Sequence, residues 1–362
     1  MAMTASGGEF PYFAHALSGR QDITNSYEVL GDLPERVGVS TQSEDLFIAN
    51  IRRIIDNDAG GTSDIATIAA TATKGAEDLY HSNLIAAVDG TDAISTMQFV
   101  TDTIYAVGVV LVTPQTHMNP RAHVTRTQAN HVTPTTQPPA GGWEEAVAQW
   151  AEYLRAAREQ EHSWTNTFRE YHVRDMALEW LGEAEDHVAL IDGPIATQNM
   201  LTQDSARDLL QQILNTARAI GFIKELSANP LLSAIGYALE PGEAFVLTSW
   251  SSILSDRFRA RQGHISGWVE NYANQLVRVI YRVGHRAFGM ETNAANIPLG
   301  LAILQHDNQG PRDHDIPMLL QIADQAARTK FKGDRARDEV IARYSRHNPS
   351  RLLSLTNERS LR

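Results

Sequence analysis

The spacing of hydrophobic positions changes along the chain from a helical to a strand-like pattern. The first forty residues are punctuated by Gly and Pro and show little periodicity. Apolar residues then recur at helical spacing over residues 41–57, and an Ala- and Thr-rich helix is predicted over residues 62–80. Short runs of branched apolar residues at 84–88 and 104–112 indicate buried strands.

From residue 83 onward, predicted strands and helices alternate. The helices are expected at 143–187 with a break near residue 164, at 203–220 and at 316–328. The strands are expected at 188–191, 244–247, 276–282 and 287–291, with a strand or loop starting at Phe222. Alternation of this kind is typical of an α/β domain, which we expect over about residues 83–330.

A polar segment at residues 113–142 interrupts this alternation. It is rich in Pro, Thr and Gln, which predicts a long loop or flap. His117, His123 and His131 lie in it at spacings of six and eight residues. Histidine is a common metal ligand, but a loop of this polarity would carry solvated histidines in any case, and we favour that interpretation.

The composition is that of a globular protein, with 43% hydrophobic and 20% charged residues. It excludes a membrane protein or a wholly disordered chain. No stretch of eighteen apolar residues exists, and the N-terminus lacks the basic and apolar regions of a signal peptide. We therefore expect a cytoplasmic protein that does not span a membrane. The absence of Cys excludes thiolate chemistry, so any metal would be bound by Asp, Glu or His.

Charge is distributed unevenly along the chain. The net charge is -12, yet residues 327–362 carry ten Lys or Arg against four acids, a net +6 that leaves -18 on the rest. We define residues 336–362 as a basic C-terminal tail. Such a tail can hold a phosphate backbone or an acidic partner, or it can simply be solvated, and both interpretations stay open.

Two predicted strands end in the same way. The runs IAAVDG and ALIDGP deliver Asp89 and Asp192 to the carboxyl edge of a sheet, where the following Gly allows a turn. A carboxylate among apolar neighbours is costly unless it is solvated, paired or bound to a cation. Two such acids at neighbouring strand ends suit a divalent metal, although two ordinary Asp-Gly turns are the alternative.

A hard cation needs at least one further oxygen ligand, and the helix before Asp192 offers several acids. Helical periodicity places Glu179 on the side opposite the apolar arc, in solvent or in a water-filled cleft. Glu170 falls inside the arc and would need a partner there. Asp175 is the third possibility on this helix.

The order of these motifs resembles the NurA nuclease family. The similarity runs over about residues 80–335, through IAAVDGTD, RDMALE, VALIDGPI, GFIKE and DIPMLLQIADQAAR. It implies an RNase H-like fold at residues 83–335, a mixed sheet flanked by helices, after a helical N-terminal extension at residues 1–80. It also implies a nuclease that uses Mn²⁺ or Mg²⁺ on DNA ends and works with a HerA-type hexameric ATPase.

The resemblance also implies roles for individual residues. Asp89 and Asp192 match two acids of the family, and we choose Glu179 as the helical acid between them, with Asp175 as its nearest alternative. Lys224 falls where the family tends to have a lysine, and would contact a phosphate.

Two further acids are weaker matches. Asp324 stands where the family presents a histidine, so it would bind a second metal or that function would be missing. Asp92 is a possible extra ligand.

The expected reaction is metal-assisted hydrolysis of phosphodiester bonds, with Asp89 bridging two cations. No GxxxxGK[ST] motif is present, so an ATPase partner would power translocation, in DNA end processing or anti-phage defence. The alternatives are an inactive scaffold that binds the translocase and a hydrolase of other phosphate compounds. The apolar face formed by Leu46, Ile51, Ile54 and Ile55 would serve a homodimer or pack on its own domain.

Overall fold

The computed structural model describes residues 41–58, 61–99, 102–130, 166–201, 203–226, 230–247, 275–284, 286–307, 316–331 and 352–355. Contacts divide the chain into two compact units, residues 1–54 and 55–362. Helix α4 (Thr41–Asp58) crosses this division and confirms the helix predicted at 41–57. None of the helices in the described ranges combines the length and the apolar character needed to cross a membrane.

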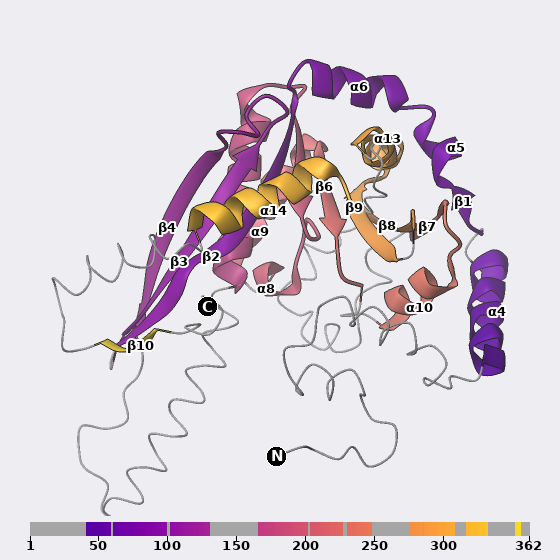
Figure 1. The fold of residues 1–362 in the computed structure, drawn as a ribbon, viewed down its shortest axis with the longest axis horizontal. Helices are drawn as coiled ribbons and strands as arrows, with labels where there is room; N and C mark the ends of the chain where they lie inside the picture. The colour runs from indigo at the N-terminus through magenta and orange to yellow at the C-terminus, as the bar shows by residue number, and fades with distance from the viewer. Residues whose placement is uncertain are drawn as a thin grey trace, which may run out of the picture. The chain divides into compact units, whose positions relative to one another are not determined.

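One mixed sheet organises the second unit (Figure 1). Its ten strands in the described ranges are β1 (Ser63–Asp64), β2 (Ile85–Phe99), β3 (Asp102–Val112), β4 (Arg121–Asn130), β5 (Val188–Asp192), β6 (Ala219–Ile223), β7 (Glu243–Leu247), β8 (Leu276–Arg282), β9 (Ala287–Asn293) and β10 (Leu352–Leu355). Their order is β1-β7-β8-β9-β6-β5-β2-β3-β4, and β10 pairs with the far end of β2.

The centre of the sheet has the strand arrangement of an RNase H-like fold. Strands β2, β3 and β4 form an antiparallel meander. Strand β5 then pairs in parallel with the free side of β2, and β6 pairs in parallel with β5. The order β4-β3-β2-β5-β6, antiparallel and then parallel, confirms the predicted mixed α/β, RNase H-like fold.

Helices cover both faces of the sheet. Successive side chains of a strand point to opposite faces, so each central strand contributes to two core clusters. Ile85 and Ala87 of β2 pack in one core cluster with α5 (Ile65–Ala69), α6 (Thr73–His81), α13 (Ile297–Asp307) and α14 (Met318–Phe331). Ala86 and Val88 pack in a second cluster with helical residues 166–183, α8 (Gln198–Leu201) and α9 (Asp204–Thr216). Figure 1 shows α14 lying across β2 and β3.

Two predicted helices have the wrong bounds, and two further helices were missed. The helix predicted at 62–80 is two helices, α5 and α6. The helix predicted at 203–220 ends at Thr216, because Ala217 adopts a left-handed conformation with φ of 51°, and β6 begins two residues later. Helices α10 (Pro230–Ala238) and α13 were not predicted at all. Helix α13 is almost uniformly apolar, so it lacks the amphipathic signal of a surface helix.

The long loop predicted at 113–142 is also corrected. Within it, residues 121–130 form β4, which pairs with β3 through ten residues. Among the described strands, β4 stands at the end of the order beside β3, and its residues 121–124 are exposed, so it needs few apolar side chains. Its Thr-rich sequence suits a strand as well as a loop. Residues 131–142 lie outside the described residues, as do 1–40, 143–165 and all of the basic C-terminal tail except β10.

Candidate active site

Three neighbouring strands place polar side chains at one edge of the sheet. Strands β2 and β5 pair in parallel up to Val88 and Ile191, so Asp89 and Asp192 follow at the same level. Lys224 comes directly after β6, the next strand. The side-chain alternation puts all three on the face that α14 covers, because Ile85, Leu190 and Phe222 of the same parity belong to the α14 core cluster.

The predicted Asp-Gly turn required a strand that ends at Asp89, but strand β2 does not end there. It continues to Phe99 and stays paired with β3, whereas its pairing with β5 stops at Val88. Asp89 therefore lies where β2 loses one neighbour, and this divergence exposes the backbone around Gly90 to a cavity.

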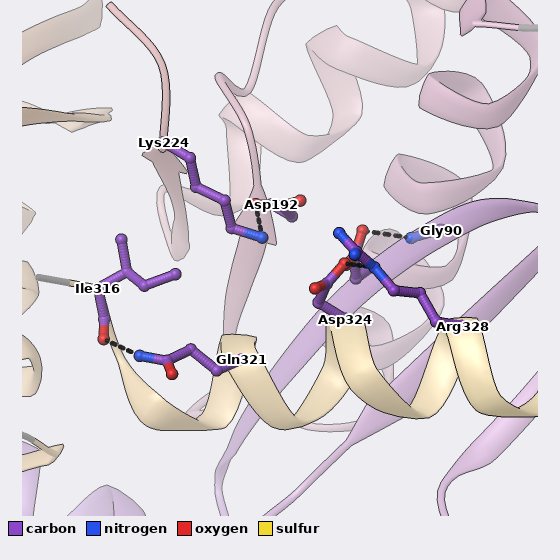
Figure 2. Close-up of polar contacts among 8 residues, drawn as sticks. Gly90, Asp192, Lys224, Ile316, Gln321, Asp324 and Arg328 are labelled. Atoms are coloured by element: carbon purple, nitrogen blue, oxygen red, sulfur yellow. Dashed lines mark hydrogen bonds and ion pairs between the residues drawn. The ribbon is translucent and has the colours of Figure 1, made fainter. Parts of the chain in front are cut away.

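The cavity holds about 380 Å³ and is open to solvent. Helix α14 contributes Asp324 and Arg328, which project toward Gly90 of β2 in Figure 2. The helix at residues 166–183 contributes Arg169, Glu170 and Arg174 from the opposite side of the sheet. The structure therefore brings four predicted site residues together: Asp89, Asp192, Lys224 and Asp324.

Asp89 is a buried acid of the cavity. Its side chain accepts a hydrogen bond from the Gly90 N–H at 2.6 Å, and the residue is 5% exposed. Burial raises the pKa of Asp89 to about 7, and the negative charges of Asp192 and Asp324 act in the same direction. The Lys224 ammonium and the Gly90 hydrogen bond oppose this rise.

Two cationic side chains pair with the other two aspartates of the cavity. The Asp192 Oδ1 atom lies 2.9 Å from the Lys224 Nζ atom, and the Asp324 Oδ1 atom accepts a hydrogen bond of 2.9 Å from the Arg328 Nε–H (Figure 2). All four side chains are partly exposed. The cavity therefore combines three aspartates with two partly exposed cationic side chains, Lys224 and Arg328, which pair with two of them.

The helical acid of this cavity is Glu170 and not Glu179. The two residues are nine positions apart, which is about two and a half helical turns, so they point to opposite sides. Glu179 is exposed and does not line the cavity. Glu170 has the partner that its position required, because the Thr197 hydroxyl donates a hydrogen bond of 2.5 Å to its Oε2 atom.

The remaining predicted acids and histidines lie elsewhere. Asp175 does not line the cavity, and one of its oxygens lies 3.8 Å from the His172 Nδ1 atom. The side chain of Asp92 and all of His131 lie outside the described residues. His117 and His123 are exposed, as the solvated interpretation predicts.

A set of buried charges fixes the loop at residues 193–197, which follows Asp192. Arg174 is 2% exposed, and its guanidinium donates to the carbonyls of Pro194 and Ile195 and to that of Glu170 on its own helix. From the other side, Glu291 of β9 accepts a hydrogen bond of 2.9 Å from the Ala196 N–H.

The same loop depends on two glycines. Gly193 has a φ of +93°, which strains any other residue. A Cβ atom at Gly221 of β6 would lie 2.5 Å from the Gly193 oxygen and 2.9 Å from the Ile195 nitrogen, so only glycine lets the loop fold over this strand.

Sequence patterns alone did not reveal the roles of Arg174 and Glu291. A signal existed for Arg174, since it stands among Val173, Met176 and Ala177 on the apolar arc of its helix, where a charge needs fixed partners. Glu291 is 0% exposed and pairs with Arg278 of β8. Because helices cover both faces of this sheet, a buried strand residue carries no alternation signal of its own.

The donor chemistry of the cavity fits a hard divalent cation. Asp89, Asp192 and Asp324 offer carboxylate oxygens, which Mg²⁺ and Mn²⁺ prefer. Burial first, and then repulsion by Asp192 and Asp324, raises the pKa of Asp89, and a cation would relieve that repulsion. In the described ranges, however, no three Asp, Glu or His side chains already stand together as a ligand group. Binding would require the carboxylates to leave Lys224 and Arg328.

No protein-family model matches the chain, and no curated protein matches its sequence. Among solved structures, the NurA nuclease from Sulfolobus solfataricus is similar at 12% identity, over 85% of this chain and 97% of that chain, with a TM-score of 0.41. A structure of NurA with manganese is similar at 12% identity, over 74% of this chain and 90% of that chain, with a TM-score of 0.38. Human ENDOV is similar at 14% identity, over 74% of this chain and 97% of that chain, with a TM-score of 0.33. We base the RNase H-like fold on the strand order and pairing of this chain.

Proposed function

We propose that the protein is a divalent-metal-dependent nuclease that hydrolyses phosphodiester bonds in DNA. The observation that supports this most directly is the convergence of Asp89, Asp192 and Asp324 with Lys224 in one open cavity. Carboxylates are the usual protein ligands of Mg²⁺ and Mn²⁺, and Lys and Arg are the usual contacts of phosphate. A cavity that joins the two chemistries suits a phosphodiester substrate.

The acids of the cavity and Lys224 have distinct roles in this proposal. Asp89 lies within the electrostatic reach of both Asp192 and Asp324, so it would share a cation with either of them. A bound divalent cation lowers the pKa of water and stabilises negative charge on a leaving oxygen. Lys224 would contact a phosphate oxygen, and Glu170, oriented by Thr197, adds a carboxylate at the opposite wall.

The proposal extends to the context in which the nuclease works. We propose a cytoplasmic enzyme that acts on DNA ends together with a HerA-type hexameric ATPase, in DNA end processing or anti-phage defence. The order of the sequence motifs supports this, as does the lack of a P-loop motif of its own. We also propose a homodimer, which the 62% exposure of Leu46 on α4 supports.

The decisive test is degradation of end-labelled linear DNA by the purified protein with Mn²⁺. Asp89→Ala and Asp192→Ala should each lower the rate by roughly 10²-fold or more, since each removes a carboxylate from the proposed cation site. Asp175→Ala and Glu179→Ala are matched controls, because both acids come from the helix at 166–183 and neither lines the cavity. Equal rates for the wild type and the two cavity variants would refute the site.

A second function, an inactive scaffold that binds the translocase, is favoured by one observation. Lys224 and Arg328 form ion pairs with two of the three aspartates, and the described residues contain no preformed group of three metal ligands. The scaffold predicts stable binding of the ATPase, no Mn²⁺ binding in calorimetry and no cleavage with or without the ATPase. Metal-dependent cleavage that requires Asp89 would exclude it.

A further inference from the structure

Lys224 and Arg328 are paired with carboxylates in a way that leaves both cations close to solvent. The Lys224 side chain is 33% exposed and that of Arg328 is 65% exposed. Both line the cavity that contains Asp89. These ion pairs therefore differ from fully buried pairs, because a partly exposed cation loses little free energy when it leaves its carboxylate.

The position of Arg328 keeps it at the cavity after such an exchange. It follows Asp324 by four residues, so the two side chains lie one helical turn apart on the same face of α14. In Figure 2 both side chains project from α14 toward Gly90. A guanidinium released by Asp324 would therefore still point into the space beside Asp89, where a substrate has to lie.

A divalent cation and the two basic side chains compete for the same oxygens. The Lys224 ammonium lies against Asp192 Oδ1, and the Arg328 guanidinium donates to Asp324 Oδ1. A cation that takes these carboxylates leaves two positive side chains without their counter-charges in one cavity of about 380 Å³. Anionic oxygens that are spaced along a chain, as in a nucleic-acid backbone, are the ligand class that such a pair binds.

We propose that Lys224 and Arg328 form a phosphate-binding pair that Asp192 and Asp324 mask until a divalent cation takes these carboxylates. Metal and nucleic acid then bind cooperatively, since each ligand removes the competitor of the other, and the coupling is the same in both directions. The inference rests on the proposed nuclease function. It adds that Arg328 is a substrate-binding residue and that the empty site resists phosphate.

The first test measures metal binding alone, by calorimetric titration of Mn²⁺ into protein without DNA. Lys224→Met and Arg328→Met each remove one competitor for the carboxylates, so each should bind Mn²⁺ more tightly than the wild type, by about tenfold. Arg121→Met is the control, because Arg121 pairs with Glu183 outside the cavity. Unchanged or weaker Mn²⁺ binding by both cavity variants would overturn the masking.

The second test measures binding of a single-stranded DNA oligonucleotide in Ca²⁺, with EDTA as the reference condition. The wild type should bind DNA several-fold more tightly in Ca²⁺, and Arg328→Met should lose most of this gain and about one unit of the salt slope. Thermal melting of each variant confirms that it is folded. An equal gain in Ca²⁺ for the wild type and Arg328→Met would remove Arg328 from the substrate site.

The two proposals fail in different ways. Cleavage that does not depend on Asp89 refutes the nuclease site itself. Cleavage that depends on Asp89, combined with unchanged Mn²⁺ affinity in Lys224→Met and Arg328→Met, refutes only the masked phosphate pair.

Discussion

Two groups of charged side chains meet near the loop at residues 193–197, and they are held in different ways. Arg174 and Glu291 are almost completely buried, and the loop backbone supplies hydrogen-bond partners to both. Lys224 and Arg328 are partly exposed, and the partners that hold them are other side chains at the cavity. The first group is fixed by the fold, whereas the second is free to exchange partners.

The difference separates the support of the site from its chemistry. A buried charge that loses its partner cannot be solvated by water instead. Removing either member of a buried pair is therefore strongly destabilising. An exposed ion pair gains little over two solvated ions, so breaking it costs little. We therefore expect substitutions in the first group to change stability and substitutions in the second to change ligand binding.

The largest effect is expected from Arg174→Met and Glu291→Leu. The first leaves the carbonyls of Pro194 and Ile195 without donors, and the second leaves Arg278, which is 11% exposed, without its carboxylate. Each should lower the free energy of unfolding by about 3–5 kcal/mol, measured by urea denaturation. Asp204→Ala is the control, because this side chain is 91% exposed, and it should change stability by no more than about 0.5 kcal/mol. A loss below about 1 kcal/mol in both buried variants would remove the distinction.

A smaller effect, of opposite sign, is expected from Asp89→Asn. Burial raises the pKa of Asp89 to about 7 in the folded protein, from an ordinary value of 3.8. Between these pH values the folded protein binds the extra proton, so its stability falls as pH rises and levels off above about pH 7. Asp89→Asn removes this loss and should stabilise the metal-free protein by about 2–4 kcal/mol at pH 8.

The measurement for Asp89→Asn is urea denaturation at pH 5 and pH 8 in the presence of EDTA. The difference between wild type and variant should grow from pH 5 to pH 8. Asp175→Asn provides the comparison, since this acid does not line the cavity. A pH-independent difference for Asp89→Asn would show that Asp89 is already ionised in the folded protein at pH 5.

The smallest effect on stability is expected from Arg328→Met. Its side chain is 65% exposed and its ion pair with Asp324 faces solvent, so the free energy of unfolding should change by less than about 0.5 kcal/mol. Urea denaturation measures this beside Arg174→Met. A large loss of stability in Arg328→Met would place this arginine in the structural group.

The sequence was sufficient to find Asp89 and Asp192, because an apolar run that ends in an acid can be recognised locally. Their proximity also followed from general rules, since the carboxyl ends of neighbouring parallel strands meet at one edge of a sheet. The fold class could be predicted for the same reason, because strands and helices alternate clearly after residue 83.

The helical acid could not be predicted, because periodicity does not distinguish a residue that faces solvent from one that faces a cleft. Glu179 is in solvent, whereas Glu170 reaches the cavity from within the apolar arc because Thr197 satisfies its carboxylate. That partner lies 27 positions away in the sequence, and no local pattern announces it. Strand β4 escaped prediction because its pairing with β3, and not its composition, makes it a strand.

The wide spread of the cavity residues along the chain also affects how the protein folds. Asp89 and Asp324 come from β2 and α14, which meet only through contacts between distant parts of the sequence. Such contacts form late, since the entropy of closing long loops is lost before the contacts stabilise the structure. A newly made or partly unfolded chain thus has its acids dispersed along it, and the cavity forms only after α14 has docked on the sheet.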